Sequence, residues 1–139
     1  MIVLDTNVLS ELMKPEASAV VLSWIAGQAR RELFTSAITL GEIMYGLEVM
    51  PVGKRRTTRL QLAGEIFGID FADRILPFDA AAARAFAVIV ASRRHAGRPI
   101  EMPDAQIAAI ARANRMAVAT RNVGDFADCG VDLINPWEG

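Results

Sequence analysis

The sequence has only one cysteine and one histidine in 139 residues. The single cysteine, Cys129, excludes an internal disulfide and a zinc site built from several cysteines, and it fits a reducing cytoplasm. The single histidine, His95, excludes any catalytic mechanism that needs two imidazole groups. Lysine is scarce as well, because Lys14 and Lys54 are the only lysines among the fifteen basic residues.

Long apolar runs and a strong net charge are also missing. The longest apolar runs, such as residues 85–91, are too short to span a bilayer. The N-terminus reaches Asp5 without a basic segment, which argues against a secretory signal peptide. The formal net charge of −1 provides no bulk attraction to nucleic acid or to anionic membranes. We therefore expect a cytoplasmic protein with no membrane partner.

The sequence does contain enough apolar material for one packed domain, because 53% of its residues are hydrophobic and 22% are charged. We expect residues 1–139 to form a single domain. Short apolar segments predict strands that are buried on both faces, at residues 2–4, 33–38, 74–76, 116–120 and 131–134. Helical patterns fall between them, at residues 20–26, 39–50, 54–71, 80–95 and 103–111. This alternation predicts an α/β fold with a mainly parallel central sheet covered on both sides by helices.

The helix expected from Thr39 opens with Thr39-Leu40-Gly41-Glu42, which matches a Ser/Thr-x-x-Glu capping box. A capping role accounts for Glu42 without any catalytic function. The apolar stripe of this helix, which is either core or an interface, consists of Leu40, Ile43, Met44, Leu47 and Met50. Gly46 lies one turn after Glu42 and leaves bare backbone beneath it.

Polar residues follow two of the expected strands. Asp5, Thr6 and Asn7 come directly after the first strand, and Thr120, Asn122 and Asp125 follow the strand at 116–120. The carboxyl ends of parallel strands are where ligands gather in such sheets. A buried, unpaired carboxylate is costly, so we favour a functional role for Asp5 over a helix cap. Asp125 is equally explained as a turn residue.

A third acidic residue, Asp104, lies in the first turn of an almost entirely apolar helix, where the helix dipole favours a negative charge by about 0.3–1 kcal/mol. Structural and functional roles are evenly balanced for this residue alone. As a set, carboxylates that converge on one crevice would repel one another, and no lysine is available to neutralise them. A hard divalent cation removes that repulsion, and oxygen ligands favour Mg²⁺ or Mn²⁺ over zinc.

Four segments taken together resemble the PIN-domain ribonucleases, and among them the VapC and FitB toxins of type II toxin–antitoxin pairs. They lie in order along the chain: Met1 to Val8, Ser36-x-x-Thr39-x-x-Glu42-x-x-x-Gly46, Asp104 to Ala108, and Thr120 to Phe126. The ending Asn135-Pro136-Trp137 is similar to FitB in particular. The resemblance covers essentially the whole chain.

The resemblance implies a three-layer α/β/α PIN-like domain that cuts single-stranded RNA with Mg²⁺ or Mn²⁺. The acids that hold the metal in the family fall on Asp5, Glu42 and Asp104. The fourth acidic position falls on Asn122, which carries no charge, and Asp125 is the candidate substitute. The resemblance also assigns supporting roles near the site to Thr6, Asn7 and Thr120.

The resemblance further implies a homodimer and a cognate antitoxin that blocks the acidic pocket, with operator DNA contacted only through that antitoxin. Because one histidine excludes a two-imidazole mechanism, we expect products with a 5′-phosphate. Two arginine-rich runs, Lys54 to Arg59 and Arg93 to Arg98, are better explained as solvated faces than as an RNA surface.

Two alternatives stay open. A haloacid-dehalogenase-type phosphatase also begins with an apolar strand, but it requires Asp-x-Asp where this sequence has Asp5-Thr6-Asn7. A catalytically silent binding module of the PIN fold is the second. The presence of all three acids argues against it, whereas Asn122 argues weakly for it.

Overall fold

The computed structural model describes residues 1–139, and its centre is a sheet of five short parallel strands in the order β3-β2-β1-β4-β5. The strands are β1 (Ile2–Leu4), β2 (Leu33–Ser36), β3 (Ile75–Leu76), β4 (Ala117–Ala119) and β5 (Leu133–Ile134). The first three strands extend the sheet in one direction, and the chain then returns to add β4 and β5 on the other side of β1. The strand order therefore reverses between β1 and β4, which is where such sheets form a ligand crevice.

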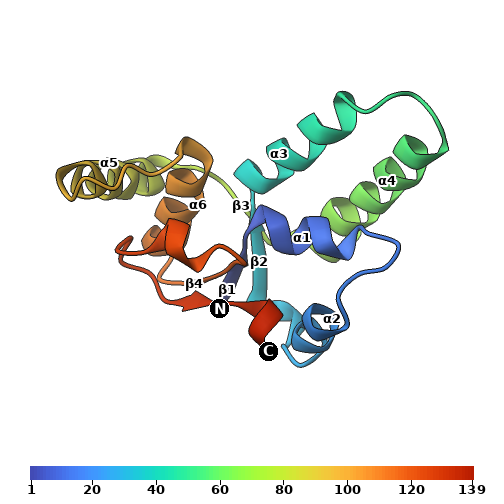
Figure 1. Ribbon diagram of the computed structural model, residues 1–139, viewed down its shortest axis with the longest axis horizontal. Coiled ribbons are helices and arrows are strands. Elements are labelled where there is room, and N and C mark those ends of the chain that lie inside the picture. The colour runs from blue at the N-terminus through green and yellow to red at the C-terminus, as the bar shows by residue number, and fades with distance from the viewer.

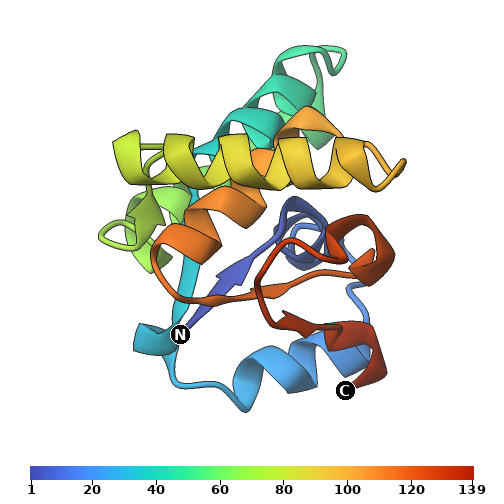
Figure 2. The ribbon, with the colours of Figure 1, turned by 90° about the vertical axis from the view of Figure 1, so that its left-hand side faces the viewer.

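Helices cover both faces of the sheet, as Figure 1 shows with the strands seen between two groups of helices. One side carries α1 (Thr6–Leu12), α2 (Ala19–Ala26), α3 (Ala37–Glu48) and α4 (Lys54–Glu65). The other side carries α5 (Ala80–His95) and α6 (Met102–Ala113), the yellow and orange helices in the upper half of Figure 2. The predicted three-layer α/β/α architecture is confirmed.

Alternation along β1 explains why the chain has two cores. Leu4 packs with Val8 and Ile43 on the α1–α4 side, whereas Val3 packs with Ile89 and Ile107 on the α5–α6 side. Neighbouring residues of a strand face opposite sides, so a strand with helices on both faces must be apolar throughout. No helix of the chain is both long and apolar enough to cross a membrane.

Side-chain caps determine where several helices begin. Asp79 Oδ1 accepts a hydrogen bond from the Ala82 backbone N–H at 3.0 Å, so α5 begins directly after Asp79 as predicted. The predicted capping box at Thr39 is wrong. Ser36 is the N-cap of α3, and its Oγ accepts from the Thr39 backbone N–H at 3.1 Å.

The strand expected at 33–38 accordingly ends at Ser36, which pairs with Leu76, the last residue of β3. After Ser36, β2 has no further residue of β3 to pair with. The strand therefore ends there, and the Ser36 hydroxyl caps the helix that follows. The helix expected at 54–71 ends as α4 at Glu65 and continues into a wider π-helical turn, Ile66–Asp70.

Candidate active site

An open cleft of about 390 Å³ lies at the carboxyl ends of β1 and β4, where the strand order reverses. Residues from widely separated parts of the chain line it. The predicted site residues on its wall are Asp5, Thr6, Asn7, Glu42, Asp104 and Asn122. The other lining residues, which carry no local signal of a site in the sequence, are Ser10, Glu11, Lys14, Arg121 and Trp137. We refer to this hollow as the acid cleft.

Asp5 is the most deeply buried acid of the cleft, with 5% of its surface exposed. It is the N-cap of α1, and its Oδ1 accepts from the Thr6 backbone N–H at 2.8 Å. The Thr120 hydroxyl donates to Asp5 Oδ2, also at 2.8 Å. Asp5 is therefore both a helix cap and a cleft residue, and the two explanations weighed from the sequence do not exclude each other.

The segment after β4 is joined to the start of α1 around the Thr120 hydroxyl. Asn7 Nδ2 and the Asn122 backbone N–H donate to this hydroxyl at 3.4 and 3.0 Å. The Arg121 backbone N–H donates in turn to Asn7 Oδ1 at 3.4 Å. These bonds hold the carboxyl ends of β1 and β4 together and orient the Asp5 carboxylate.

Glu42 takes no part in capping α3 and instead turns toward α1. The Thr6 hydroxyl donates to Glu42 Oε1 at 2.7 Å and lies 3.0 Å from the Thr39 hydroxyl, which is 3.4 Å from the Ser36 hydroxyl. Because the Thr6 hydroxyl donates its hydrogen to Glu42, it must accept from the Thr39 hydroxyl. The hydroxyls of Ser36, Thr39 and Thr6 thus form a row of hydrogen bonds in which each donates to the next and the last donates to the Glu42 carboxylate. A chain of this kind strengthens its last bond. No local signal in the sequence predicts that the hydroxyls of Ser36 and Thr39 are linked to the site in this way.

Asp104 lies in the first turn of α6, half-buried, and its side chain makes neither a hydrogen bond nor an ion pair. Burial raises its pKa to about 6, with further contributions from the negative charges of Asp5, Asp125, Glu42 and Glu101. Burial also raises the pKa of Asp5, although its hydrogen bonds oppose this. None of the six ion pairs of the chain involves Asp5, Glu42 or Asp104. No ion pair within the fold therefore neutralises these three carboxylates.

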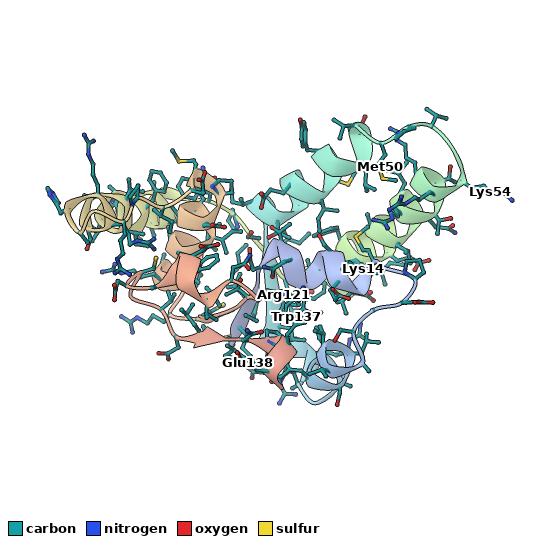
Figure 3. The ribbon with its side chains drawn as sticks, in the orientation of Figure 1. Lys14, Met50, Lys54, Arg121, Trp137 and Glu138 are labelled. Carbon is teal, nitrogen blue, oxygen red and sulfur yellow. The ribbon has the colours of Figure 1, made fainter.

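The two cations that line the cleft are bound to other groups. Lys14 Nζ lies 3.0 Å from Glu11 Oε1, and the Arg121 guanidinium lies over the Trp137 ring at 5.1 Å from its centre. Figure 3 labels Lys14 at the end of α1 and Arg121 beside Trp137. Glu11 is buried and also accepts from the Ser18 backbone N–H, and these hydrogen bonds, with Lys14 first, lower its pKa. Glu11 therefore connects α1 to the start of α2.

Asp125 does not line the acid cleft. It lies exposed in a short 3₁₀ turn, Val123–Phe126, although its charge still acts on Asp5 and Asp104. Its backbone carbonyl accepts from Arg93 Nη1 at 3.0 Å. Of the two candidates for the fourth site position, only Asn122 is on the cleft wall.

Arg93 is buried, so the expectation that its run is a solvated face is wrong for this residue. Its side chain also donates to the carbonyls of Ala127 and Arg98, at 3.0 and 2.7 Å. It thereby anchors the segment that follows Asn122. Its position could have predicted burial, because Arg93 continues the helical stripe of Ala82, Phe86 and Ile89 at spacings of four, three and four.

The chemistry of the cleft fits a hard divalent cation that keeps part of its water. The carboxylates surround the cleft without converging on one point, and no three His, Cys, Asp or Glu side chains are arranged to hold an ion directly. Mg²⁺ usually retains several waters and uses only one or two carboxylates. Asp5, Asp104 and Glu42 present only oxygen donors and carry uncompensated charge, so they suit an ion held largely through water.

Comparison with known proteins agrees with this geometry. The PIN domain family matches residues 2–130. The VapC ribonuclease Y4jK of Sinorhizobium fredii is 48% identical over 139 residues, and the alignment covers 99% of each chain. Toxin FitB of Neisseria gonorrhoeae is 35% identical over 137 residues, again with 99% of each chain covered.

A solved structure of FitAB bound to the IR36 DNA fragment superposes with a TM-score of 0.92 at 36% identity. The superposition covers 99% of this chain and 96% of that one. These matches extend beyond the four short segments to the full length of the fold. The chain therefore belongs to the PIN-domain family, in the group that contains VapC and FitB.

Proposed function

We propose that this protein is a ribonuclease toxin that hydrolyses RNA phosphodiester bonds with Mg²⁺ or Mn²⁺ and is inhibited by a cognate antitoxin. The main support is the uncompensated charge of Asp5, Glu42 and Asp104 around one open cleft. The relatives named VapC ribonuclease and toxin FitB support the same activity and biological role. Membership of the PIN-domain family argues against the phosphatase alternative.

In this proposal the cleft residues have separate roles in hydrolysis. A divalent ion, when bound, supplies an activated water and neutralises the charge that develops on the phosphate. Asp5, oriented by Thr120, and Asp104, free of other bonds, would hold that ion. Glu42, kept in place by Thr6, would orient the attacking water, and Asn122 lines the same cleft.

Products with a 5′-phosphate and a 3′-hydroxyl follow from this arrangement. Attack by the neighbouring 2′-hydroxyl is typically assisted by a pair of acid and base groups such as two imidazoles. The single histidine, His95, ends α5 and does not line the acid cleft. Water is therefore the proposed nucleophile.

The proposed protein partners are a second copy of the chain and the antitoxin. Exposed apolar side chains support such contacts, among them Tyr45 on α3, Val49 directly after α3 and Val88 on α5. The FitAB structure that this chain resembles was solved with a DNA fragment. We propose that this chain reaches operator DNA only through its antitoxin.

The test is cleavage of single-stranded RNA labelled at both ends, with and without Mg²⁺ or Mn²⁺. Asp5→Asn should reduce the rate more than about 100-fold while the fold is retained. Asp132→Asn is the matched control, because Asp132 is exposed and precedes β5, at the opposite end of the sheet. Equal rates for Asp5→Asn and wild type, or a 2′,3′-cyclic phosphate product, would contradict the proposal. RNA binding without any cleavage would favour the silent binding module.

A further inference from the structure

A second hollow, of about 640 Å³, continues from the acid cleft along α1 and α3 to the start of α4. It shares Thr6, Ser10 and Glu42 with the acid cleft, so the two form one continuous depression. We refer to the second hollow as the helical groove. Its apolar lining residues are Met13, Ile43, Leu47, Met50 and Val52.

The far end of the helical groove carries three cations, Lys54, Arg55 and Arg59, which we refer to as the cationic rim. Figure 3 labels Met50 at the end of α3 and Lys54 at the start of α4, on either side of the connecting loop. The same three cations, together with Lys14, also line a neighbouring hollow of about 420 Å³. The rim therefore lies between two depressions.

No side chain of the cationic rim is used to hold the fold together. None forms an ion pair or a side-chain hydrogen bond. Arg56, within the same run, differs from them: its Nε donates to the Leu47 carbonyl at 2.8 Å, and its Nη2 lies 3.5 Å from Glu48. The structure thus separates one arginine that joins α4 to α3 from three cations with free charge.

The start of α4 adds to the positive potential. Its N-cap, Gly53, has no side chain to accept from the first N–H groups, and the first turn contains no acidic residue. The unpaired N–H groups at a helix start carry partial positive charge. Because the whole chain has a net charge of −1, any attraction for a polyanion must come from such a local surface.

We propose that the helical groove binds the RNA strand on one side of the cleavage site, with its phosphates on the cationic rim and its bases against the apolar floor. This inference rests on the proposed ribonuclease function. The carboxylates of the acid cleft repel a phosphodiester, so cations next to the cleft would assist RNA binding. Two members of the rim are arginines, whose planar guanidinium groups suit phosphate oxygens.

The length of the groove sets the length of RNA it can hold. Glu42 lies six residues before Glu48, the last residue of α3, and a helical rise of about 1.5 Å per residue places them about 9 Å apart along the helix, with the rim beyond it at the start of α4. At about 3.4 Å per nucleotide of a stacked strand, the helical part alone corresponds to about three nucleotides, and reaching the rim takes about one more. Contacts with the rim therefore require about four nucleotides beyond the cut on the groove side.

The binding test uses the full-length chain with Asp5→Asn, so that the RNA is not cut. The rim variant carries Lys54→Ala, Arg55→Ala and Arg59→Ala. The matched control carries Arg31→Ala, Arg84→Ala and Arg94→Ala, which remove three exposed arginines that lie outside the groove and make no side-chain bonds. Fluorescence anisotropy with a single-stranded RNA is measured over a range of salt concentrations, and thermal melting confirms that both variants fold.

The rim variant should bind RNA at least about tenfold more weakly, with a log–log salt slope lower by about 2, whereas the control should change less than twofold. Equal weakening by the two variants would overturn the inference, because it would show only a general charge effect. An unchanged salt slope in the rim variant would overturn it too. So would loss of antitoxin binding with RNA binding intact, which would assign the groove to the protein partner.

Cleavage by the active chain separates this inference from the proposed function. On an RNA with a mapped cut, the rim variant should raise KM and leave kcat unchanged. The RNA is then shortened stepwise from each end. On one side of the cut, removal of about four nucleotides should make the KM of wild type and rim variant equal. Normal cleavage with unchanged KM in the rim variant would overturn this inference alone. No cleavage and no RNA binding by the wild type would overturn both.

Discussion

Asp5 and Arg93 are both almost completely buried, at 5% and 6% exposure, and neither has an ion-pair partner. Arg93 donates to the carbonyl of Arg98, in the loop after its own helix, and to those of Asp125 and Ala127, in the segment after β4. Asp5 accepts one hydrogen bond on each oxygen and still lies on the wall of an open cleft. Its remaining lone pairs are available to a ligand.

The two residues differ in whether the hydrogen-bonding capacity of a buried charge is used within the fold or is left facing a cleft. A buried charge whose hydrogen-bonding capacity is used within the fold stabilises that fold. A buried charge with unused capacity facing a cleft, next to charges of the same sign, is destabilising unless something binds there. Asp104, with no partner at all and a pKa raised to about 6, belongs to the second kind.

Replacing Arg93, the buried arginine that binds three backbone carbonyls, should have the largest effect on stability. Arg93→Ala removes a buried side chain together with its hydrogen bonds to three backbone carbonyls, and it should lower the free energy of unfolding by about 3 kcal/mol. Urea denaturation measures this change. Arg94→Ala, at the exposed neighbouring position, is the control and should change stability by less than about 0.5 kcal/mol. Similar losses for the two variants would mean that Arg93 does not anchor the segment after β4.

Removing the Thr6 hydroxyl, which donates to Glu42, should affect activity more than stability. Thr6→Val deletes the 2.7 Å hydrogen bond to Glu42 while keeping the shape of the side chain. RNA cleavage should fall about 10–100-fold, as is typical for groups that orient residues at a metal site. Thr6→Ser keeps the hydroxyl and should retain most of the activity. Equal losses in Thr6→Val and Thr6→Ser would indicate a packing role instead.

The smallest predicted effect is a gain in stability when one unpaired acid is neutralised. The pKa of Asp104 is raised from 3.8 to about 6 in the folded chain, so the folded state binds this proton more tightly than the unfolded state. Protonation of Asp104 therefore favours the folded state. Its contribution to the free energy of unfolding is complete below about pH 4 and is lost as the pH rises through about 6. Without divalent ions, Asp104→Asn should therefore be more stable than wild type by about 1 kcal/mol at pH 7.5, after allowance for solvent screening.

Denaturation of wild type and Asp104→Asn between pH 4 and pH 8 measures this difference, which should disappear at the acidic end. Adding Mg²⁺ at pH 7.5 should stabilise the wild type and have little effect on the variant. Asp132→Asn serves as the control with no pH-dependent difference. A wild type that is more stable than Asp104→Asn at pH 7.5 without metal would contradict the uncompensated charge.

Local signals were sufficient for several parts of the structure. Apolar strands such as Ile2–Leu4 and the start of α5 at Asp79 depend on residues close in sequence, and both were predicted. The choice between Ser36 and Thr39 as the cap of α3 depended on where β2 runs out of a partner, which is a long-range property. The bond between Thr6 and Glu42 could not be predicted for the same reason, since 36 residues separate them.

The two arginine-rich runs show the limit of charge patterns. Lys54 to Arg59 and Arg93 to Arg98 look alike in the sequence, yet Arg56 and Arg93 bind backbone carbonyls while Lys54 and Arg55 remain free. A guanidinium becomes a structural anchor only where the fold places unpaired carbonyls within its reach.

By itself, the order of apolar and polar residues determined a layered α/β chain with acids after its strands, because hydrophobic periodicity and helix caps act over a few residues. The tertiary structure alone decided that Asp5, Glu42 and Asp104 share one cleft, that Asp125 lies outside it, and that the cationic rim is free. These outcomes depend on strand order and helix packing, through which residues a hundred positions apart change one another's charge and hydration.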